Sequence, residues 1–524
     1  MALGTVTAQE RFDSPRGLLG DRLRGIYRLL ADHGDRVFPY DYFADCYKES
    51  ARGRPTVPAR VLATTMVLQA HEGLSDAEAC DRLERDLAWQ AAAGVHTGYA
   101  AFHPTVLVGQ RNRLRASARP RRLFEDTRTA ATEAGLMGNR VRVVDSTPVY
   151  DSVTTQDTVT QLRAATRKLL RALDRDYPVL AARVRAGLRR DDDYASAGKP
   201  PCDWDDPEAK EALVDALVRD ARAALAALDG EGLAGPAQAA AELAALVAGQ
   251  DVDESDDDGV FRIARRVAPD RTISTVDPEA RHGHKSHNRR FDGYKAHVSI
   301  DPDSELIDEV VVTPANAPDA TAVKDLLAPV RHAEHKPTVM GDSAYAGADT
   351  LDDLETAGFA DVKAKVPPAR GREGRFGKDD FEVDLAAGTV SCPAGQVVPI
   401  RFGANRSGRA DFADACAACA LRERCTTSAS GRSVTIHRKE AVLQRHKAAQ
   451  TDPAWQADYR STRPKVERKI AHLVRVMWGG RKARTRGKAR VATDIDTRAA
   501  AVNWARLATL GAHMVNGRWV TVPP

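Results

Sequence analysis

Apolar residues recur at three- and four-residue spacing through the first part of the chain, from residue 15 to about 120. The segments RLRGIYRLLADHG and PARVLATTMVLQAHEG show this spacing, which is typical of amphipathic helices. SDAEACDRLERDLAWQAAAG should form another helix, because Ser75 is a good N-cap and Glu78 follows three residues later, as in a capping box. The pattern predicts a helical domain over residues 1–135, suited to DNA binding or dimerisation.

At RVRVVDSTPVY the pattern becomes that of a strand, and from about 156 to 250 it is alanine-rich and helical. We interpret residues 156–269, which contain the acidic run DVDESDDD (Asp251–Asp258), as a helical insertion. GYKAHVSIDPDSELIDEVVVTPA predicts a hairpin with its turn at DPDS. It is followed by a helix (DATAVKDLLAPVRHAEH), a strand (PTVMGD), a helix (ADTLDDLETAG) and a strand (ADVKAKVP). Residues 136–155 and 270–367 are therefore expected to form a mixed sheet covered by helices, an α/β fold.

The last third of the chain changes pattern twice. Residues 368–436 are rich in Gly, Arg and Cys, with short strand signals, and suggest a small insertion. Helix returns from about Lys439 through Trp478, and TRAAAVNWARLATLGAHM is one more amphipathic helix. We therefore assign residues 437–524 to a set of C-terminal helices.

Length and composition limit the class of protein. A chain of 524 residues is too long for one ordinary core, so two to four domains are expected. There is no run of about 18 apolar residues, so we expect no membrane span. The N-terminal MALGTVTAQERFDSPRG lacks the basic start and apolar core of a secretory signal. The expected location is the cytoplasm.

The charged residues are unevenly distributed. The net charge is only +4, but basic residues gather in RNRLRASARPRR (Arg111–Arg122) and RKARTRGKAR (Arg481–Arg490). Blocks of one sign on a mixed chain favour a polyanion partner such as nucleic acid, although they are also found on solvated surfaces. The histidine-containing stretch RHGHKSHNRRFDGYKAHV is interpreted in the same way, as a cationic loop that contacts phosphate rather than a metal site.

Two predicted strands end on an aspartate, Asp145 in VRVVDSTPVY and Asp342 in PTVMGDSAYAG. If the strands share a sheet, the two carboxylates can lie side by side, where they repel each other unless a cation separates them. Mg²⁺ prefers such oxygen ligands, and two such ions stabilise the attacking and leaving oxygens of a phosphodiester displacement. The alternative, that each aspartate caps the following turn, is weaker for the pair than for either residue alone.

A third carboxylate is available in DYRSTRPKVERKIAHLVRVMWGG. On a single helix Tyr459, Arg463, Glu467 and Arg475 would share one face, so that basic residues could hold a DNA backbone beside a metal-binding acid. Alternatively, Pro464 begins a helix and Glu467 only complements the N-terminal dipole of that helix.

Four of the seven cysteines lie close together in the sequence. Such a set suits a closed tetrahedral Zn²⁺ site of structural rather than catalytic type. An iron–sulfur cluster or unliganded thiols are the alternatives. The proposed ligands are Cys392, Cys416, Cys419 and Cys425.

The motifs VVDST, GYKAHV, GDSAYAG and YRSTRPKVER, in this order, resemble those of the DDE transposases of bacterial insertion sequences. The cysteine pattern CPAG…CAAC…C is similar to the IS-eleven-eighty-two type within the IS-four/IS-five superfamily. The resemblance covers about 40–120, 140–150 and 270–510. It implies an RNase H-like fold with helices on both faces of the sheet, in which Asp145, Asp342 and Glu467 hold Mg²⁺ or Mn²⁺.

The resemblance also implies an activity: cleavage of transposon ends followed by strand transfer into target DNA. Its DNA partners would be terminal inverted repeats and target sites, bound by a homodimer or larger assembly. The alternatives are a catalytically inactive DNA-binding remnant or repressor, or a related metal-dependent nuclease. Two positions depart from the family signature, because Tyr459 is one residue too far from Arg463 and the lysine position falls on Val474, beside Arg475. The candidate DNA-binding residues are Lys285, Tyr294, Lys295, Arg463, Arg475, Arg481, Lys482 and Arg484.

Overall fold

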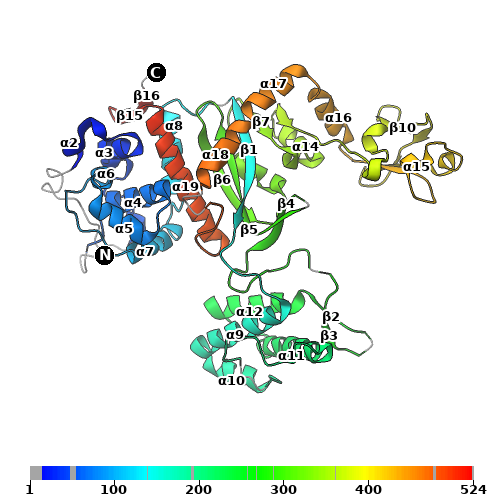
Figure 1. Ribbon diagram of the computed structural model, residues 1–524, viewed down its shortest axis with the longest axis horizontal. Helices are drawn as coiled ribbons and strands as arrows, with labels where there is room; N and C mark the ends of the chain where they lie inside the picture. Colours follow the sequence, from blue (N-terminus) through cyan, green and yellow to red (C-terminus); the bar gives the residue numbers. More distant parts are fainter. Residues whose placement is uncertain are drawn as a thin grey trace.

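The computed structural model in Figure 1 describes residues 15–47, 55–138, 140–190, 194–256, 258–266, 268–286, 288–359, 361–475 and 480–521. Buried hydrophobic side chains in these ranges form four clusters. Two clusters lie on either side of a central sheet, one lies in the predicted insertion, and one lies in the cysteine-containing segment. The N-terminal residues inspected for a secretory signal fall largely outside the described residues.

The N-terminal helices form as the apolar spacing predicts. At α5, Ser75 and Glu78 make the predicted capping box, with each side chain bonded to the backbone N–H of the other residue. The hydrophobic side chains of these helices belong to the same cluster as one face of the sheet, so the helices have no separate core. The helices are α2 (Pro15–Leu19), α3 (Gly25–Val37), α4 (Ala59–Glu72), α5 (Asp76–Arg85), α6 (Leu87–Ala93), α7 (Thr105–Arg115) and α8 (Arg122–Glu133).

The predicted mixed sheet is confirmed. β1 pairs antiparallel with β5 and parallel with β7, β7 pairs parallel with β8, and β5 forms the predicted hairpin with β6. β4 pairs with the first part of β5, so the stretch expected to be a cationic loop is instead a second hairpin. The strands are β1 (Val141–Tyr150), β4 (Arg281–Ser286), β5 (Arg289–Asp301), β6 (Leu306–Pro314), β7 (Thr338–Gly341) and β8 (Val362–Ala364).

Alternate side chains of β1 face different layers. Val143 and Val149 lie in the cluster shared with the N-terminal helices, and Val144 lies in the cluster on the other face. That second face is covered by η3 (Asp319–Ala322), α13 (Val323–Leu326), η4 (Ala328–Val330) and α14 (Ala348–Thr356). The long helix expected over 319–335 is wrong, because the chain forms only short helical turns there and Pro329 interrupts the backbone hydrogen bonds.

The alanine-rich insertion has a core of its own, which Figure 1 shows below the sheet. Its acidic run provides the first strand of a short hairpin, and Asp251 at the start of the run forms a buried ion pair with Arg271. Its elements are α9 (Thr158–Asp176), α10 (Pro178–Ala186), α11 (Pro207–Ala226), α12 (Gly235–Gly249), β2 (Val252–Glu254) and β3 (Phe261–Ile263).

The cysteine-containing segment forms two small three-stranded sheets at one end of the molecule (Figure 1). Its core includes Phe381, Phe412 and Cys416. Its elements are β9 (Glu382–Asp384), β10 (Thr389–Ser391), β11 (Val397–Pro399), β12 (Arg401–Phe402), β13 (Gly408–Asp411), α15 (Arg422–Cys425) and β14 (Ser433–Ile436).

The C-terminal helix expected from Lys439 through Trp478 is three helices, α16 (Glu440–Ala449), α17 (Pro453–Thr462) and α18 (Pro464–Leu473). Each break precedes a proline, which lacks the N–H that would continue the helix. Residues 476–479 lie outside the described residues. α19 (Lys488–Thr509) follows and leads into a hairpin, β15 (Ala512–Val515) with β16 (Arg518–Thr521), which the hydrophobic pattern did not predict. No helix in the described ranges is apolar over a length that could span a bilayer.

His297 of β5 makes the sheet sensitive to acid. Its ring is fully buried, Nε2 bonds to the Thr313 hydroxyl, and Nδ1 has no hydrogen-bond partner among the described residues. Burial lowers the pKa of His297 from 6.5 to about 4, against the opposing charge of Asp319. Since the unfolded chain binds this proton more readily, stability falls as pH drops through this range.

We therefore expect the wild type to lose about 3 kcal/mol of its free energy of unfolding through this histidine as pH falls from 6.5 to about 4. His297→Gln, which cannot titrate, should lose correspondingly less. Urea unfolding curves across this pH range measure the difference. The exposed His332→Gln is the matched control and should follow the wild type. Parallel pH profiles for His297→Gln and the wild type would contradict the assignment.

Candidate active site

Asp342 directly follows β7, as predicted, but the expectation that the other strand ends on Asp145 is wrong, because β1 continues through Asp145 to Tyr150. β1 and β7 are parallel and Val143 pairs with Met340, so each aspartate follows two residues after this pair. Asp145 is buried, and burial raises its pKa to about 6. The charges of Asp342 and Glu467 add to this rise in pKa, while Arg463 and the Ser146 N–H oppose it. The sheet thus gathers excess negative charge at one edge.

Asp342 also serves the local backbone. It is the N-cap of η5 (Ser343–Tyr345), where its Oδ1 accepts a hydrogen bond of 2.9 Å from the Ala344 N–H. This contact agrees with the alternative drawn from the sequence, that Asp342 caps the turn that follows it. Its second carboxylate oxygen is not needed for the cap, and the residue is only partly buried, so capping and ligand binding are compatible.

Glu467 lies in the first turn of α18, which begins at Pro464, as the dipole interpretation expected. It is nevertheless connected to Asp145 through Arg463. One Arg463 Nη contacts the Asp145 Oδ2 at 2.9 Å, and the other contacts the Glu467 carboxylate. The helix break at Pro464 therefore leaves Glu467 linked to Asp145 through Arg463, but among the described residues the three carboxylates of Asp145, Asp342 and Glu467 are not grouped closely enough to hold a metal ion.

Tyr459 reaches the same edge despite its departure from the family spacing. Its ring is buried and stacks on Trp455 with centroids 5.0 Å apart. Its hydroxyl donates a hydrogen bond of 3.0 Å to the carbonyl of Gly341, the residue before Asp342. Tyr459 therefore fixes the end of β7 against α17 rather than pointing at a ligand.

Sequence reasoning missed Asp319, which lies beside the residue that follows Asp145 on β1. Its carboxylate accepts hydrogen bonds from the Ser146 hydroxyl at 2.5 Å and from the Lys295 Nζ at 2.6 Å. Asp319 thus fixes the residue next to Asp145. No sequence motif indicated Asp319, because the loop PANAP separates it from the preceding strand.

Two candidate DNA-binding residues are engaged in contacts with other residues of the protein. Tyr294 is fully buried and its hydroxyl donates to Asp277 at 2.6 Å. Lys295 is mostly buried in its ion pair with Asp319. Neither offers a free polar group at the surface, so a contact with DNA is not supported for either residue.

The other cations lie near the surface. Lys285 is exposed on β4, and Arg475 is partly exposed just after α18. The Arg481 Nε donates to the Thr147 hydroxyl at 2.9 Å, and Lys482 pairs with Tyr150 at the end of β1. Arg484 donates to the carbonyls of Gly73 and Leu74 at the end of α4. The segment that begins at Arg481 therefore runs from the active-site strand to the N-terminal helices.

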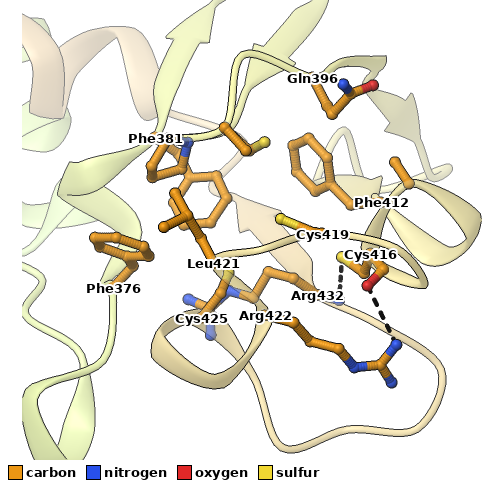
Figure 2. A pocket seen from close by; sticks show the side chains of 14 residues that line it. Phe376, Phe381, Gln396, Phe412, Cys416, Cys419, Leu421, Arg422, Cys425 and Arg432 are labelled. Atoms are coloured by element: carbon orange, nitrogen blue, oxygen red, sulfur yellow. Dashed lines mark hydrogen bonds between the residues drawn. The ribbon is translucent and has the colours of Figure 1, made fainter.

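The four clustered cysteines line one pocket, part of which Figure 2 shows. Burial raises the pKa of Cys425, and the other three thiols add to this effect, which indicates that the four are neighbours. The Cys416 Sγ accepts a hydrogen bond from the Arg432 backbone N–H at 3.4 Å. The structure shows no zinc site: in the part of the chain that it describes, no three His, Cys, Asp or Glu side chains are grouped to hold a metal ion.

Two family models match the chain. Residues 264–504 match the family described as "Transposase DDE domain", and residues 19–113 match "Transposase domain (DUF772)". Together the matches support a DDE transposase, a family of DNA-acting enzymes that use divalent metal ions. The first match includes Asp342, Arg463 and Glu467 but begins after Asp145. Asp145 lies near Asp342 because β1, which contains it, pairs with β7. No curated protein and no solved structure matches the chain.

Removal of the Tyr459 hydroxyl tests its structural role. Tyr459→Phe leaves the Gly341 carbonyl without its donor and should lower the free energy of unfolding by about 1 kcal/mol. Tyr40→Phe, at an exposed tyrosine, should leave stability unchanged and is the matched control. Denaturant unfolding at neutral pH measures both. Equal stability of Tyr459→Phe and the wild type would show that this hydrogen bond does not hold the end of β7.

Proposed function

We propose that this protein is a DNA transposase that cleaves transposon ends and joins them to target DNA at Asp145, Asp342 and Glu467. The observation that carries the proposal is the register of β1 and β7, which brings two aspartates to one sheet edge, together with Arg463, which connects Asp145 to Glu467. The cysteine-containing segment before α18 supports the finer assignment to the IS-eleven-eighty-two type.

The strand order supports an RNase H-like catalytic core. An antiparallel hairpin, β5 with β6, lies on one side of β1, and the parallel strands β7 and β8 lie on the other. We propose that residues 136–155 and 270–367 form this core, completed by α18. The separate hydrophobic clusters of the helical insertion and the cysteine-containing segment support treating both as insertions.

The donor set fits a hard divalent cation, because all three groups are carboxylates and Asp145 is destabilised as an anion by its surroundings. We propose that Asp145, Asp342 and Glu467 hold Mg²⁺ or Mn²⁺. The bound ions would generate the nucleophile and stabilise charge on the phosphodiester oxygens. For the carboxylates to bind metal, Arg463 must break its ion pairs with Asp145 and Glu467. Its guanidinium is then available to bind a DNA phosphate.

The remaining proposed DNA contacts are the cations that lie at or near the surface, Lys285, Arg475, Arg481, Lys482 and Arg484. Their role is to hold the phosphate backbone so that the scissile bond stays in line for attack. Because two transposon ends must be joined in one reaction, we propose that a homodimer or larger assembly acts on DNA, in the cytoplasm with the nucleoid.

Cleavage of the gene's own flanking DNA tests the proposed activity. The wild type should nick a defined end in the presence of Mg²⁺ or Mn²⁺, and Asp342→Asn should lose this activity by at least about 10²-fold because a carboxylate ligand is removed. Asp325→Asn on α13, an exposed aspartate away from the site, is the matched control and should cleave like the wild type.

The alternatives give different results. Specific binding to the flank without cleavage under either metal would indicate an inactive DNA-binding protein. Cleavage without joining to a second duplex would indicate a nuclease. Equal cleavage by Asp342→Asn and the wild type would remove Asp342 from the active site.

We further propose that Cys392, Cys416, Cys419 and Cys425 bind a structural Zn²⁺. The support is that four thiols line one pocket in a small domain with a limited core. Purified protein should retain equimolar zinc, and Cys419→Ser should lose it and unfold at lower temperature. Cys202→Ser, in the helical insertion, is the control. Zinc-free wild-type protein with unchanged stability after addition of zinc would contradict the proposal.

A further inference from the structure

A cleft of about 590 Å³ lies between the N-terminal helices and the start of α19, and none of Asp145, Asp342 and Glu467 lines it. One wall comes from α4 and α7, and the other from the segment 484–497. α19 lies between the blue N-terminal helices and the central sheet in Figure 1, so the cleft is on the boundary of the two regions. Its charged and amide lining residues are Gln69, Asp76, Arg111, Asn112, Arg115, Arg484, Arg490 and Asp494.

The positive charge of this cleft is only partly neutralised. Its two aspartates are already paired, Asp76 with Arg111 and Asp494 with Arg498. The other three arginines of the cleft are Arg115, Arg484 and Arg490. Within the described residues, none of them forms an ion pair with a carboxylate.

Like charges face each other across the cleft. Burial lowers the pKa of Arg115, and the neighbouring charges of Arg490 and Arg111 lower it further. Arg115 belongs to α7 and Arg490 to α19, so the fold holds two repelling cations together from separate elements. The buried Thr485 hydroxyl, which also lines the cleft, has no hydrogen-bond partner among the described residues. Unpaired cations beside an unused hydroxyl suit an anionic ligand with several oxygens.

The cleft is connected to the proposed active site by a short stretch of backbone. The Arg481 side chain bonds to Thr147, which lies on the same face of β1 as Asp145. The Ala483 N–H then donates to the Tyr150 carbonyl, and Arg484 bonds to the end of α4 at the cleft. Cations therefore follow one another from the carboxylates to the cleft, as a continuous polyanion requires and a single small anion does not.

We propose that this cleft binds the sugar–phosphate backbone of the DNA whose reacting phosphodiester lies at Asp145 and Asp342. This inference rests on the proposed function and adds a second, remote contact region for the same duplex. Phosphates would neutralise Arg115 and Arg490 together and thereby fasten the N-terminal helices to the catalytic sheet. The contacts go to the backbone, so they position the DNA and carry no sequence information directly.

The test is fluorescence anisotropy of a labelled duplex that carries the gene's flanking sequence, titrated with the full chain over a range of salt. Arg115→Gln and Arg490→Gln should each weaken binding several-fold. Each should also lower the slope of log affinity against log salt by about 0.9 for every phosphate that the variant no longer neutralises. Arg85→Gln, at an exposed arginine of α5 outside the cleft, is the charge-matched control and should bind like the wild type.

The outcomes separate this inference from the proposed function. If both variants match Arg85→Gln in affinity and salt slope while the wild type cleaves DNA, the cleft is not a DNA site and the proposed function stands. If the wild type binds no duplex, the proposed function and the inference both fail. If the variants bind weakly but cleave at wild-type rate once DNA is saturating, the cleft positions DNA and takes no part in the chemistry.

Discussion

The double ion pair of Arg463 is the interaction on which the proposed site depends. Asp145 belongs to a strand, Glu467 to a helix that begins after a proline, and 322 residues of the 524-residue chain separate them along the sequence, from 145 to 467. Arg463 brings the two carboxylates together without a metal ion. In the proposed metal site the same contact engages the carboxylates of Asp145 and Glu467, so metal binding there would require the release of Arg463. A DNA phosphate that accepts the guanidinium would couple the two events.

The helical segment that we propose to be an insertion accounts for the long separation in sequence between the proposed site residues. It leaves the sheet after β1, buries its own hydrophobic cluster, and returns before β4. Hydrogen bonds join the residues at which the chain enters this segment to those at which it leaves. The Gln161 side-chain amide donates to the Thr272 carbonyl, and the Thr275 N–H donates to the Gln156 side chain. Because the entropic cost of a longer connection grows slowly, a self-folding insertion can be accommodated here without disturbing the pairing of β1 with β5 and β7.

The two strands that carry or precede the aspartates and the order of the sheet elements could be predicted from the sequence, because apolar runs followed by Asp and the hairpin at DPDS are local signals. The end of the first strand was misplaced, since β1 continues past Asp145 to Tyr150. Features that depend on tertiary contacts could not be predicted from the sequence. Burial of Tyr294 and the pairing of Lys295 with Asp319 follow from the faces of β5, which residue types alone do not reveal. The shared core of the N-terminal helices and the sheet was missed for the same reason. The break at Pro464, by contrast, was visible in the sequence, and only its role beside Arg463 required the structure.

The central claim is that Asp145, Asp342 and Glu467 form one divalent-metal site that Arg463 occupies in the free protein. Titration with Mn²⁺, followed by electron paramagnetic resonance with and without flanking DNA, tests it most directly. We expect DNA to strengthen Mn²⁺ binding to the wild type, and Asp145→Asn to abolish the signal of bound Mn²⁺. Arg463→Gln should bind Mn²⁺ more tightly than the wild type when DNA is absent. Equal Mn²⁺ binding by Asp145→Asn and the wild type would contradict the claim.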